Sequence, residues 1–167
     1  MNEPAMDPIA AIEEQWRRER PDLDLAAMVV FGRLGRLAVV ARRRIDAVFI
    51  AHGLRSGEFD VLAALRRAGA PFELNPSTLA DTLMLSRAGM TGRLDRLESV
   101  GYVRRTADAT DRRAVRVGLT AAGRELVDTV VTAHTENESR MLAALTEPER
   151  RELDRLTAKL LDALESP

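Results

Sequence analysis

Apolar residues recur every three or four positions over much of the chain, which is the spacing of a helix with one buried face. At the start, Ile9, Ile12 and Trp16 predict a short helix that Pro21 ends. A long amphipathic helix ending near Gly53 is then predicted from Val30, Leu34, Leu37, Ala41, Ile45 and Val48. We expect this long helix to serve as a scaffold for the rest of the chain.

Serine residues open three shorter predicted helices, because a serine side chain is a favourable N-cap. These helices cover residues 56–68, 77–83 and 86–100. Gly69 ends the first and Gly101 ends the last. The second and third helices follow each other after a tight turn.

The hydrophobic period changes from helical spacing to two after Gly101. Val115, Val117 and Leu119 alternate with Arg116 and Gly118, as in a half-buried strand. Residues 102–106 are its expected partner, and the polar segment 107–113 between them forms a hairpin with a basic tip. This hairpin is expected to be a wing beside the two short helices.

Helical spacing returns in the last third of the chain. Thr120 is expected to cap a helix that runs to about Leu145. Thr146, Pro148 and Glu149 match the capping-box and first-turn proline signals of a final helix. A stripe along this final helix consists of Leu153, Leu156, Leu160 and Leu164.

Charge is unevenly distributed along the chain. The whole sequence has a formal net charge of -1, yet residues 77–118 contain eight arginines and five acidic residues. The segment with the two short helices and the hairpin therefore carries a surplus of three positive charges. A basic surface confined to one part of a chain is typical of nucleic-acid-binding proteins.

Composition excludes several other chemistries. The chain has no cysteine, which excludes disulfides, thiolate metal sites and cysteine nucleophiles. His52 and His134 lack the spacing of a metal site, so we expect neither a metal nor another cofactor. No apolar run is long enough to span a bilayer and the acidic start is unlike a secretion signal, so a cytoplasmic chain without a membrane partner is expected.

The third short helix has the pattern of a DNA-recognition helix. Met90, Leu94 and Leu97 share one side, and the small residues Ala88 and Gly92 lie on the opposite side with Asp95 and Ser99. Small outward residues allow the backbone to approach base edges closely. The expected DNA-contacting residues of this helix are Ser86, Arg87 and Thr91 near its start and Arg96 on its flank, towards phosphate. An ordinary solvated helix is the alternative interpretation.

The predicted hairpin tip adds two arginines to this surface. An ion pair between Asp111 and Arg113 is expected to fix the loop, and either Arg112 or Arg113 is expected to enter a minor groove. A solvated surface hairpin is the alternative, but two adjacent arginines beside a helix-turn-helix have an electrostatic use.

Four segments together resemble the MarR family of transcriptional regulators. They are the helix at 86–100, Gly-Tyr-Val-Arg-Arg at 101–105, Asp-Arg-Arg at 111–113 and Leu-Thr-Ala-Ala-Gly at 119–123. The resemblance implies a homodimer that binds pseudo-palindromic double-stranded DNA and usually represses transcription until a ligand or oxidant releases it. The leucine stripes of the terminal helices agree, because a compact winged helix alone could not cover them.

The expected architecture is mainly α with a small β-hairpin, a winged helix-turn-helix with N- and C-terminal dimerisation helices. Residues 1–53 form the N-terminal helices, for dimerisation and one wall of a ligand pocket. Residues 54–120 form the DNA-binding domain, and residues 121–167 form the C-terminal dimerisation helices.

A finer resemblance concerns the ligand. Urate-responsive MarR proteins have an extra N-terminal helix with a tryptophan, an aspartate followed seven residues later by an arginine, and an arginine in the recognition helix. Trp16, Asp60, Arg67 and Arg93 fit this pattern and are the expected ligand-binding residues. Packing of Trp16 and structural salt bridges of the charged residues are the alternatives.

The spacing of the charged pair has physical meaning of its own. Asp60 and Arg67 share a helix face but lie about 10 Å apart along the axis, too far to pair easily. An anion or Arg93 is expected between them, with Ala63 and Ala64 leaving the space. A ligand bridging Arg67 and Arg93 would move the recognition helix.

Other functional classes lack support in the sequence. We find no phosphate loop, no nucleophile with a histidine partner and no carboxylate cluster, so neither an enzyme nor catalytic residues are expected. Within the regulator class, urate or a related purine is the leading effector, and a small carboxylate such as aconitate is the alternative. A winged-helix protein without a small-molecule effector is the remaining alternative.

Overall fold

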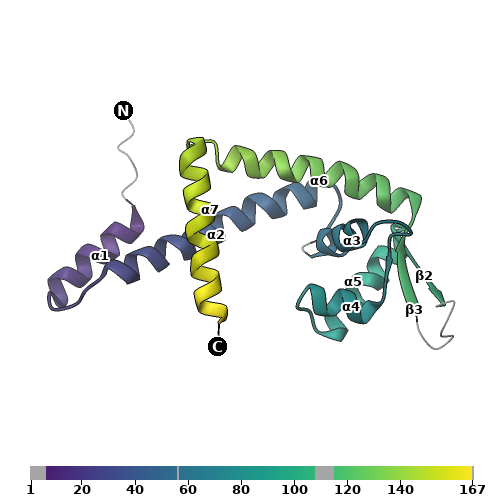
Figure 1. Cartoon of the computed structure of the whole chain (residues 1–167), viewed down its shortest axis with the longest axis horizontal. Helices are drawn as coiled ribbons and strands as arrows, with labels where there is room; N and C mark the ends of the chain where they lie inside the picture. The colour runs from purple at the N-terminus through teal and green to yellow at the C-terminus, as the bar shows by residue number, and fades with distance from the viewer. Residues whose placement is uncertain (1–6, 56, 108–114, 167) are drawn as a thin grey trace. The chain divides into compact units, whose positions relative to one another are not determined.

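The structure is a computed structural model that describes residues 7–55, 57–107 and 115–166. The chain divides between Arg44 and Ile45 into two compact units. Helices dominate both units, and one small antiparallel sheet lies in the second (Figure 1). The predicted mainly helical fold with a small β-hairpin is confirmed.

The first unit contains helix α1 (Pro8–Glu19) and most of helix α2 (Ala26–Ala51). Asp7 caps α1 by accepting a hydrogen bond from the Ile9 backbone at 3.1 Å. That bond and the nearby Arg33 guanidinium hold the pKa of Asp7 below its ordinary value. Ile9 packs on Gly32, where a side chain on α2 would crowd it. The helices predicted over Ile9–Trp16 and up to Gly53 are therefore both present.

Helix α2 leaves many large apolar side chains exposed in a single chain. They are Met28, Val30, Phe31, Leu37, Val39, Val40 and Ile50. Monomeric proteins rarely expose so much contiguous apolar surface, so such surfaces usually bind another chain.

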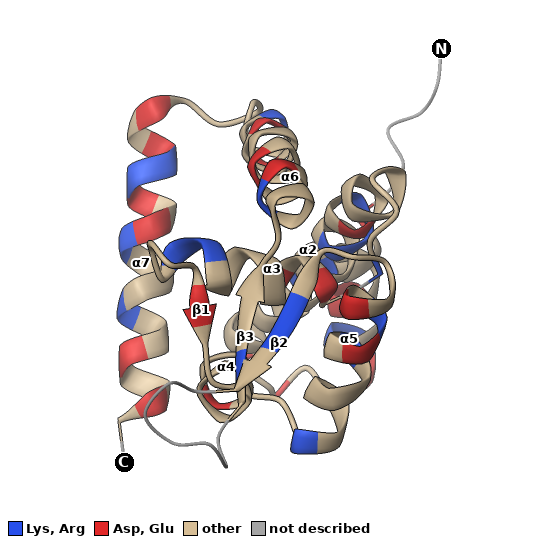
Figure 2. Ribbon diagram, turned by 90° about the vertical axis from the view of Figure 1, so that its right-hand side faces the viewer, with Lys and Arg blue, Asp and Glu red and all other residues tan. Residues whose placement is uncertain are grey.

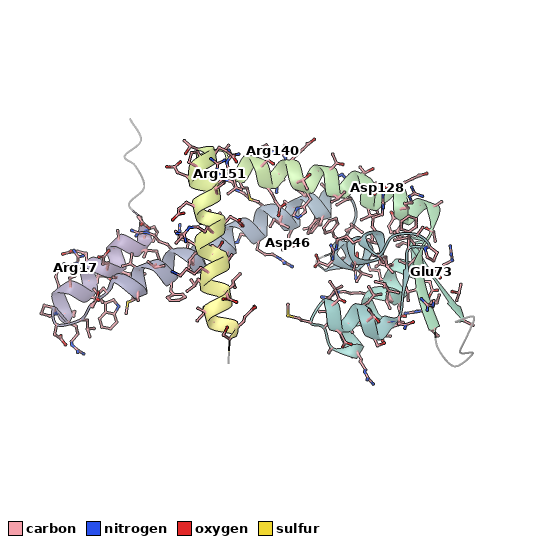
Figure 3. The ribbon with its side chains drawn as sticks, in the orientation of Figure 1. Arg17, Asp46, Glu73, Asp128, Arg140 and Arg151 are labelled. Carbon is pink, nitrogen blue, oxygen red and sulfur yellow. The ribbon has the colours of Figure 1, made fainter. Side chains whose placement is uncertain are left out.

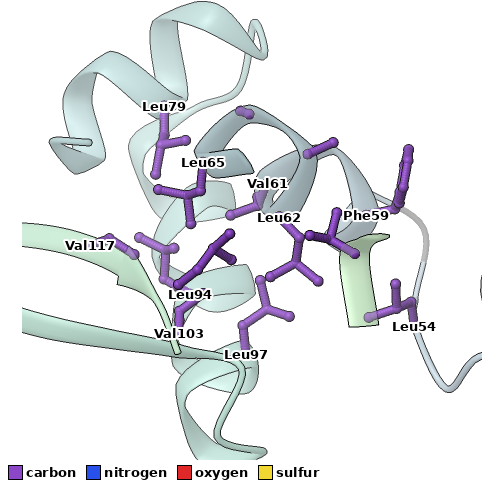
Figure 4. Packing of buried hydrophobic residues seen from close by; sticks show 14 of the residues in the cluster. Leu54, Phe59, Val61, Leu62, Leu65, Leu79, Leu94, Leu97, Val103 and Val117 are labelled. Atoms are coloured by element: carbon purple, nitrogen blue, oxygen red, sulfur yellow. The ribbon is translucent and has the colours of Figure 1, made fainter. Parts of the chain in front are cut away.

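The core of the second unit joins helix α3 (Glu58–Arg67) to helices α4 (Pro76–Thr82) and α5 (Arg87–Ser99). Leu62 and Leu65 of α3 meet Leu94 and Leu97 of α5, and all four are essentially inaccessible to solvent (Figure 4). The predicted inward face of α5 is confirmed, because Met90 is buried with Leu94 and Leu97. The packing fixes α5 from behind and leaves its other face outward.

A three-stranded sheet closes one side of this core in the order β1-β3-β2. Strands β2 (Val103–Ala107) and β3 (Val115–Leu119) pair antiparallel as predicted, with Val103 opposite Leu119. Strand β1 (Glu73–Leu74) was not predicted. It is only two residues long and has no alternating pattern of its own; it is held by β3, opposite Gly118 and Val117.

Two helix starts differ from the sequence prediction. Gly57, in a left-handed conformation, is the N-cap of α3, and Glu58 accepts a hydrogen bond from the Arg55 backbone there. Ser56, the predicted cap, lies outside the described residues. Helix α4 begins at Pro76 after the N-cap Asn75, one residue before the predicted Ser77. Proline suits this first position because its fixed φ is helical and its missing N–H would be unpaired anyway.

Both C-terminal helices begin as predicted. Thr120 caps helix α6 (Ala121–Met141) by accepting a hydrogen bond from the Gly123 backbone, although α6 ends before the predicted Leu145. Helix α7 (Glu147–Glu165) has the expected capping box of Thr146 and Glu149. The Thr146 hydroxyl and backbone N–H lower the pKa of Glu149. No described residue of α7 is buried, and its exposed leucines are Leu156, Leu160, Leu161 and Leu164.

Glycine at position 123 is required by the junction between α6 and the sheet. A Cβ atom there would meet the Tyr102 carbonyl oxygen at less than contact distance, and the obstacle is backbone. We predict that Gly123→Ala lowers the free energy of unfolding by about 2–3 kcal/mol, as overpacked core sites do. Gly92→Ala, in an exposed part of α5 with open space around it, should instead raise it by about 0.5–1 kcal/mol. Urea unfolding of both variants tests this, and equal effects would contradict it.

Candidate DNA-binding interface and effector site

Helices α4 and α5 form the helix-turn-helix predicted from the sequence. The turn between them includes Met84, whose positive φ of 51° reverses the chain after α4. Ser86 then caps α5, because its hydroxyl accepts a hydrogen bond from the Gly89 backbone at 3.1 Å. The start of α5 is therefore fixed locally by its own sequence.

The expected DNA-contacting residues at the start of α5 are all exposed: Ser86, Arg87 and Thr91. Arg87 and Thr91 also line a cavity of about 190 Å³ with Pro76, Ser77 and Met90. This cavity lies where α4 and α5 both begin, and helix N-termini favour phosphate groups. The cavity thus lies beside two of the residues that are expected to contact DNA.

The rest of the outward face of α5 is built from small residues, as predicted. Ala88, Gly92 and Ser99 are exposed, and Asp95 is exposed beside them. Acidic and basic residues both occur on α5, and the charged residues of β2 are all basic (Figure 2). Some of these charges are neutralised by partners within the protein.

Arg96 has a partner inside the protein. Its Nε lies 2.8 Å from Oε1 of Glu58, a side chain that is only 3% exposed, and its Nη2 donates to the Gly53 carbonyl at 3.3 Å. This contact holds α5 to the start of α3. Arg96 was expected to face phosphate, and no local sequence pattern reveals the burial of Glu58.

Arg93 lies against the backbone of Gly57. A Cβ atom at Gly57 would be 2.6 Å from Nε of Arg93, so only glycine leaves room for this guanidinium. Its Nη1 atom is buried and has no hydrogen-bond partner among the described residues. The Arg93 side chain therefore points back to α3.

Asp60 and Arg67 lie on α3 with different exposure. Asp60 is half-buried, one helical turn after Gly57, and Arg67 is exposed at the end of the helix. Neither has an ion-pair partner in the part of the chain that the structure describes. Gly57 and Arg67 are ten residues apart, about 15 Å along the helix axis, so the Arg93 guanidinium at Gly57 lies at the opposite end of α3 from Arg67.

The expected open space between Asp60 and Arg67 is not present. Ala63 and Ala64 are each only 5% exposed and belong to the hydrophobic core. The helix wheel placed them on the same face as the two charges, but it carries no information about what packs there. The structure therefore brings Asp60 and Arg93 to one end of α3 and leaves Arg67 at the other.

Trp16, the fourth expected ligand residue, is on α1 in the first unit. It is 41% exposed, and its carbonyl accepts a hydrogen bond from the Arg20 backbone at the end of the helix. Its indole is thus not buried within its own unit, although the alternative interpretation, simple packing of Trp16, predicts that it would be buried.

Charged pairs hold the stem of the wing. Arg104 of β2 reaches across β3 to Glu73 of β1 at 2.8 Å, and it can do so because Gly118 between them has no side chain (Figure 3 labels Glu73). Arg105 of β2 pairs with Asp95 and Glu98 of α5. Neither pair was predicted from the sequence. The expected tip residues Asp111, Arg112 and Arg113 lie outside the described residues.

Among the described residues, no three histidine or acidic side chains are grouped so that they could hold a metal ion. No described helix has an apolar stretch of the length needed to cross a membrane.

The sequence and the structure are both similar to known regulators. A model of the MarR family matches residues 52–114. The transcriptional regulator PecS of Dickeya dadantii is 42% identical over 152 residues, which cover 91% of this chain and 92% of PecS. The repressor MdtR of Bacillus subtilis is 31% identical and covers 68% of this chain and 72% of its own.

A solved structure of a mutant form of the Escherichia coli protein MarR, in complex with operator DNA, is also similar. That protein is 25% identical, with a TM-score of 0.70 over 82% of this chain and 97% of its own. AbsC of Streptomyces coelicolor, a MarR family transcriptional regulator that is 21% identical, has the same fold with a TM-score of 0.75 over 85% of this chain and 96% of its own.

Loss of the Glu58–Arg96 pair should lower the free energy of unfolding more than loss of a surface ion pair does. We predict that Glu58→Ala lowers the free energy of unfolding by about 2–4 kcal/mol, because it leaves Arg96 and the Arg55 backbone without their buried acceptor. Asp128→Asn, which weakens the solvent-exposed pair of Asp128 with Arg66, should cost less than about 1 kcal/mol. Urea unfolding of both variants provides the comparison, and similar costs would rule out a special role for the buried carboxylate.

Proposed function

The chain belongs to the MarR family of DNA-binding transcriptional regulators, and on that premise we propose that it is a repressor released from DNA by a small anionic ligand. Urate or another purine is the first candidate ligand, because Trp16, Asp60, Arg67 and Arg93 fit the pattern of urate-responsive family members. A small carboxylate such as aconitate is the second candidate.

The observation that carries the proposal is one unpartnered nitrogen, Nη1, of the Arg93 guanidinium. Guanidinium groups have five N–H donors, and a buried donor without an acceptor is costly. Nη1 of Arg93 is such a donor within the described residues. An anion next to Gly57 and Asp60 would supply the acceptor, and charge-assisted hydrogen bonds to guanidinium are among the strongest available.

Asp60 favours a purine over a carboxylate. Urate presents both carbonyl acceptors and ring N–H donors, so one molecule can accept from Arg93 and donate to Asp60. Aconitate carries only carboxylates at neutral pH, and Asp60 would repel them. Arg67 lies too far along α3 for a direct bridge to Arg93, so we assign it an indirect effect on the charge of the site.

Ligand binding would act on DNA through the contact between α3 and α5. Arg93 lies on the same helix as Arg87 and Thr91, which face outward at its start. Drawing the Arg93 guanidinium away from Gly57 would shift α5 against α3. A repressor released in this way needs only a small displacement, because base contacts require close approach.

The proposed working form is a homodimer on a pseudo-palindromic operator. The exposed apolar side chains of α2 and α7 support this, since a single chain leaves them in contact with water. In this proposal, residues 1–53 and 121–167 provide dimerisation helices, and residues 54–120 bind DNA. The wing tip with Arg112 and Arg113 would contact the minor groove.

A thermal-shift titration with urate, xanthine, hypoxanthine and aconitate tests the effector. A ligand at about 100 times its Kd stabilises the native state by about 2.7 kcal/mol, which should raise the Tm by about 5–10 °C. We predict such a rise with urate for the wild type and its loss in Arg93→Ala. Asp60→Asn should weaken binding of a purine but strengthen binding of a carboxylate.

Arg87→Ala is the matched control, because it removes another arginine from the same helix. It should keep the urate-dependent rise in Tm while weakening DNA binding. If none of the four compounds raises the Tm of the wild type, the effector proposal fails and the membership of the family is unaffected.

A further inference from the structure

Arg105 is the most extensively bonded charged residue in the wing stem among those whose bonds the structure describes. Its Nη2 lies 2.7 Å from Oδ1 of Asp95, and its Nη1 lies 2.8 Å from Oε2 of Glu98. Its backbone N–H also donates to Oε1 of Glu98 at 3.1 Å. One residue of β2 is therefore held by three hydrogen bonds to one helix.

The two carboxylates lie on the same flank of α5, because they are three residues apart. The guanidinium of Arg105 spans both of them with its planar fork, which a lysine ammonium could not do. On the sheet side, Arg105 is opposite Val117 of β3, a fully buried residue at the base of the hairpin. The contact thus joins the recognition helix to the rigid base of the wing.

The other flank of α5 is held in a similar way. There Arg96 pairs with the buried Glu58 of α3. The C-terminal half of α5 is consequently fixed by charged contacts on both sides, through Arg96 on one flank and through Asp95 and Glu98 on the other. In the first turns, Arg87 and Thr91 are exposed to a ligand such as DNA.

We propose that Arg105 is a positioning residue that locks the wing to the recognition helix, so that both reach DNA at a fixed separation. A winged protein needs this, because its helix and its hairpin contact neighbouring grooves of one rigid duplex. Arg105 is not a phosphate contact in this proposal. The inference depends on DNA binding by the family and is independent of the effector.

Replacing the two carboxylate partners of Arg105 distinguishes the two possible roles, because the roles predict opposite changes in operator affinity. The double variant Asp95→Asn, Glu98→Gln keeps Arg105 but deletes two negative charges near DNA. If Arg105 bound phosphate, this variant would bind operator at least as tightly as the wild type. If Arg105 positions the wing, specific binding weakens even though the protein has become more positive.

The experiment uses the full-length protein and a duplex selected by the wild type from a random-sequence library. Affinity is measured for this operator and for a scrambled duplex at fixed salt. We expect Arg105→Ala and the double variant each to lose about ten-fold or more in operator affinity. Affinity for scrambled DNA should stay within about two-fold for Arg105→Ala and should rise for the double variant.

Two further variants complete the test. Arg105→Lys keeps the charge but loses the fork, so it should lose most of the operator affinity that Arg105→Ala loses; a phosphate contact would be largely retained by lysine. Asp81→Asn with Glu125→Gln removes two exposed carboxylates of the same kinds elsewhere in the unit, and it should not weaken operator binding.

Thermal melting checks that all variants are folded, since exposed ion pairs contribute little stability. Operator affinity equal to or above wild type in the double variant would overturn the proposal. Wild-type affinity in Arg105→Ala would also overturn it.

Discussion

Burial of Met90, Leu94 and Leu97 against α3 and the sheet fixes the recognition helix, and the rest of the DNA-binding surface depends on that packing. These side chains are almost completely removed from water, each contributing about 1.5–3 kcal/mol relative to an exposed position. Because they occupy one face, the residues of the opposite face must point outward. Ala88 and Gly92 are there, small enough for a helix that approaches base edges.

Apolar packing decides which face of the helix is inward, although the hydrophobic effect itself has no direction. Charged contacts on both flanks add directional restraints. Glu58, buried at the start of α3, binds Arg96, and Arg105 of the wing stem binds Asp95 and Glu98. Directional bonds of this kind contribute more to the orientation of an element than to stability. A surface that must fit a rigid duplex needs such orientation.

In the proposed function, the same helix would transmit the effect of a ligand to DNA. Arg93 rests on Gly57, where no side chain separates the guanidinium from the backbone of α3. A buried nitrogen without a hydrogen-bond partner is a costly arrangement that an added acceptor would relieve. Because packed cores have discrete arrangements, a small change at this contact can be transmitted to the outward face of α5.

The sequence by itself determined the order of the elements, the inward face of α5, the caps Ser86 and Thr120 and the hairpin. Each of these depends on neighbours within a few residues, such as an apolar period or a side chain bonding to a nearby backbone N–H. Tertiary structure alone decided that Glu58 is buried, that Ala63 and Ala64 are covered, and that β1 joins the sheet. Glu58 and its partner Arg96 are 38 positions apart in the sequence, and Glu73 and Gly118 are 45 apart. Contacts over such separations arise from how elements pack, which a helical or strand period does not encode.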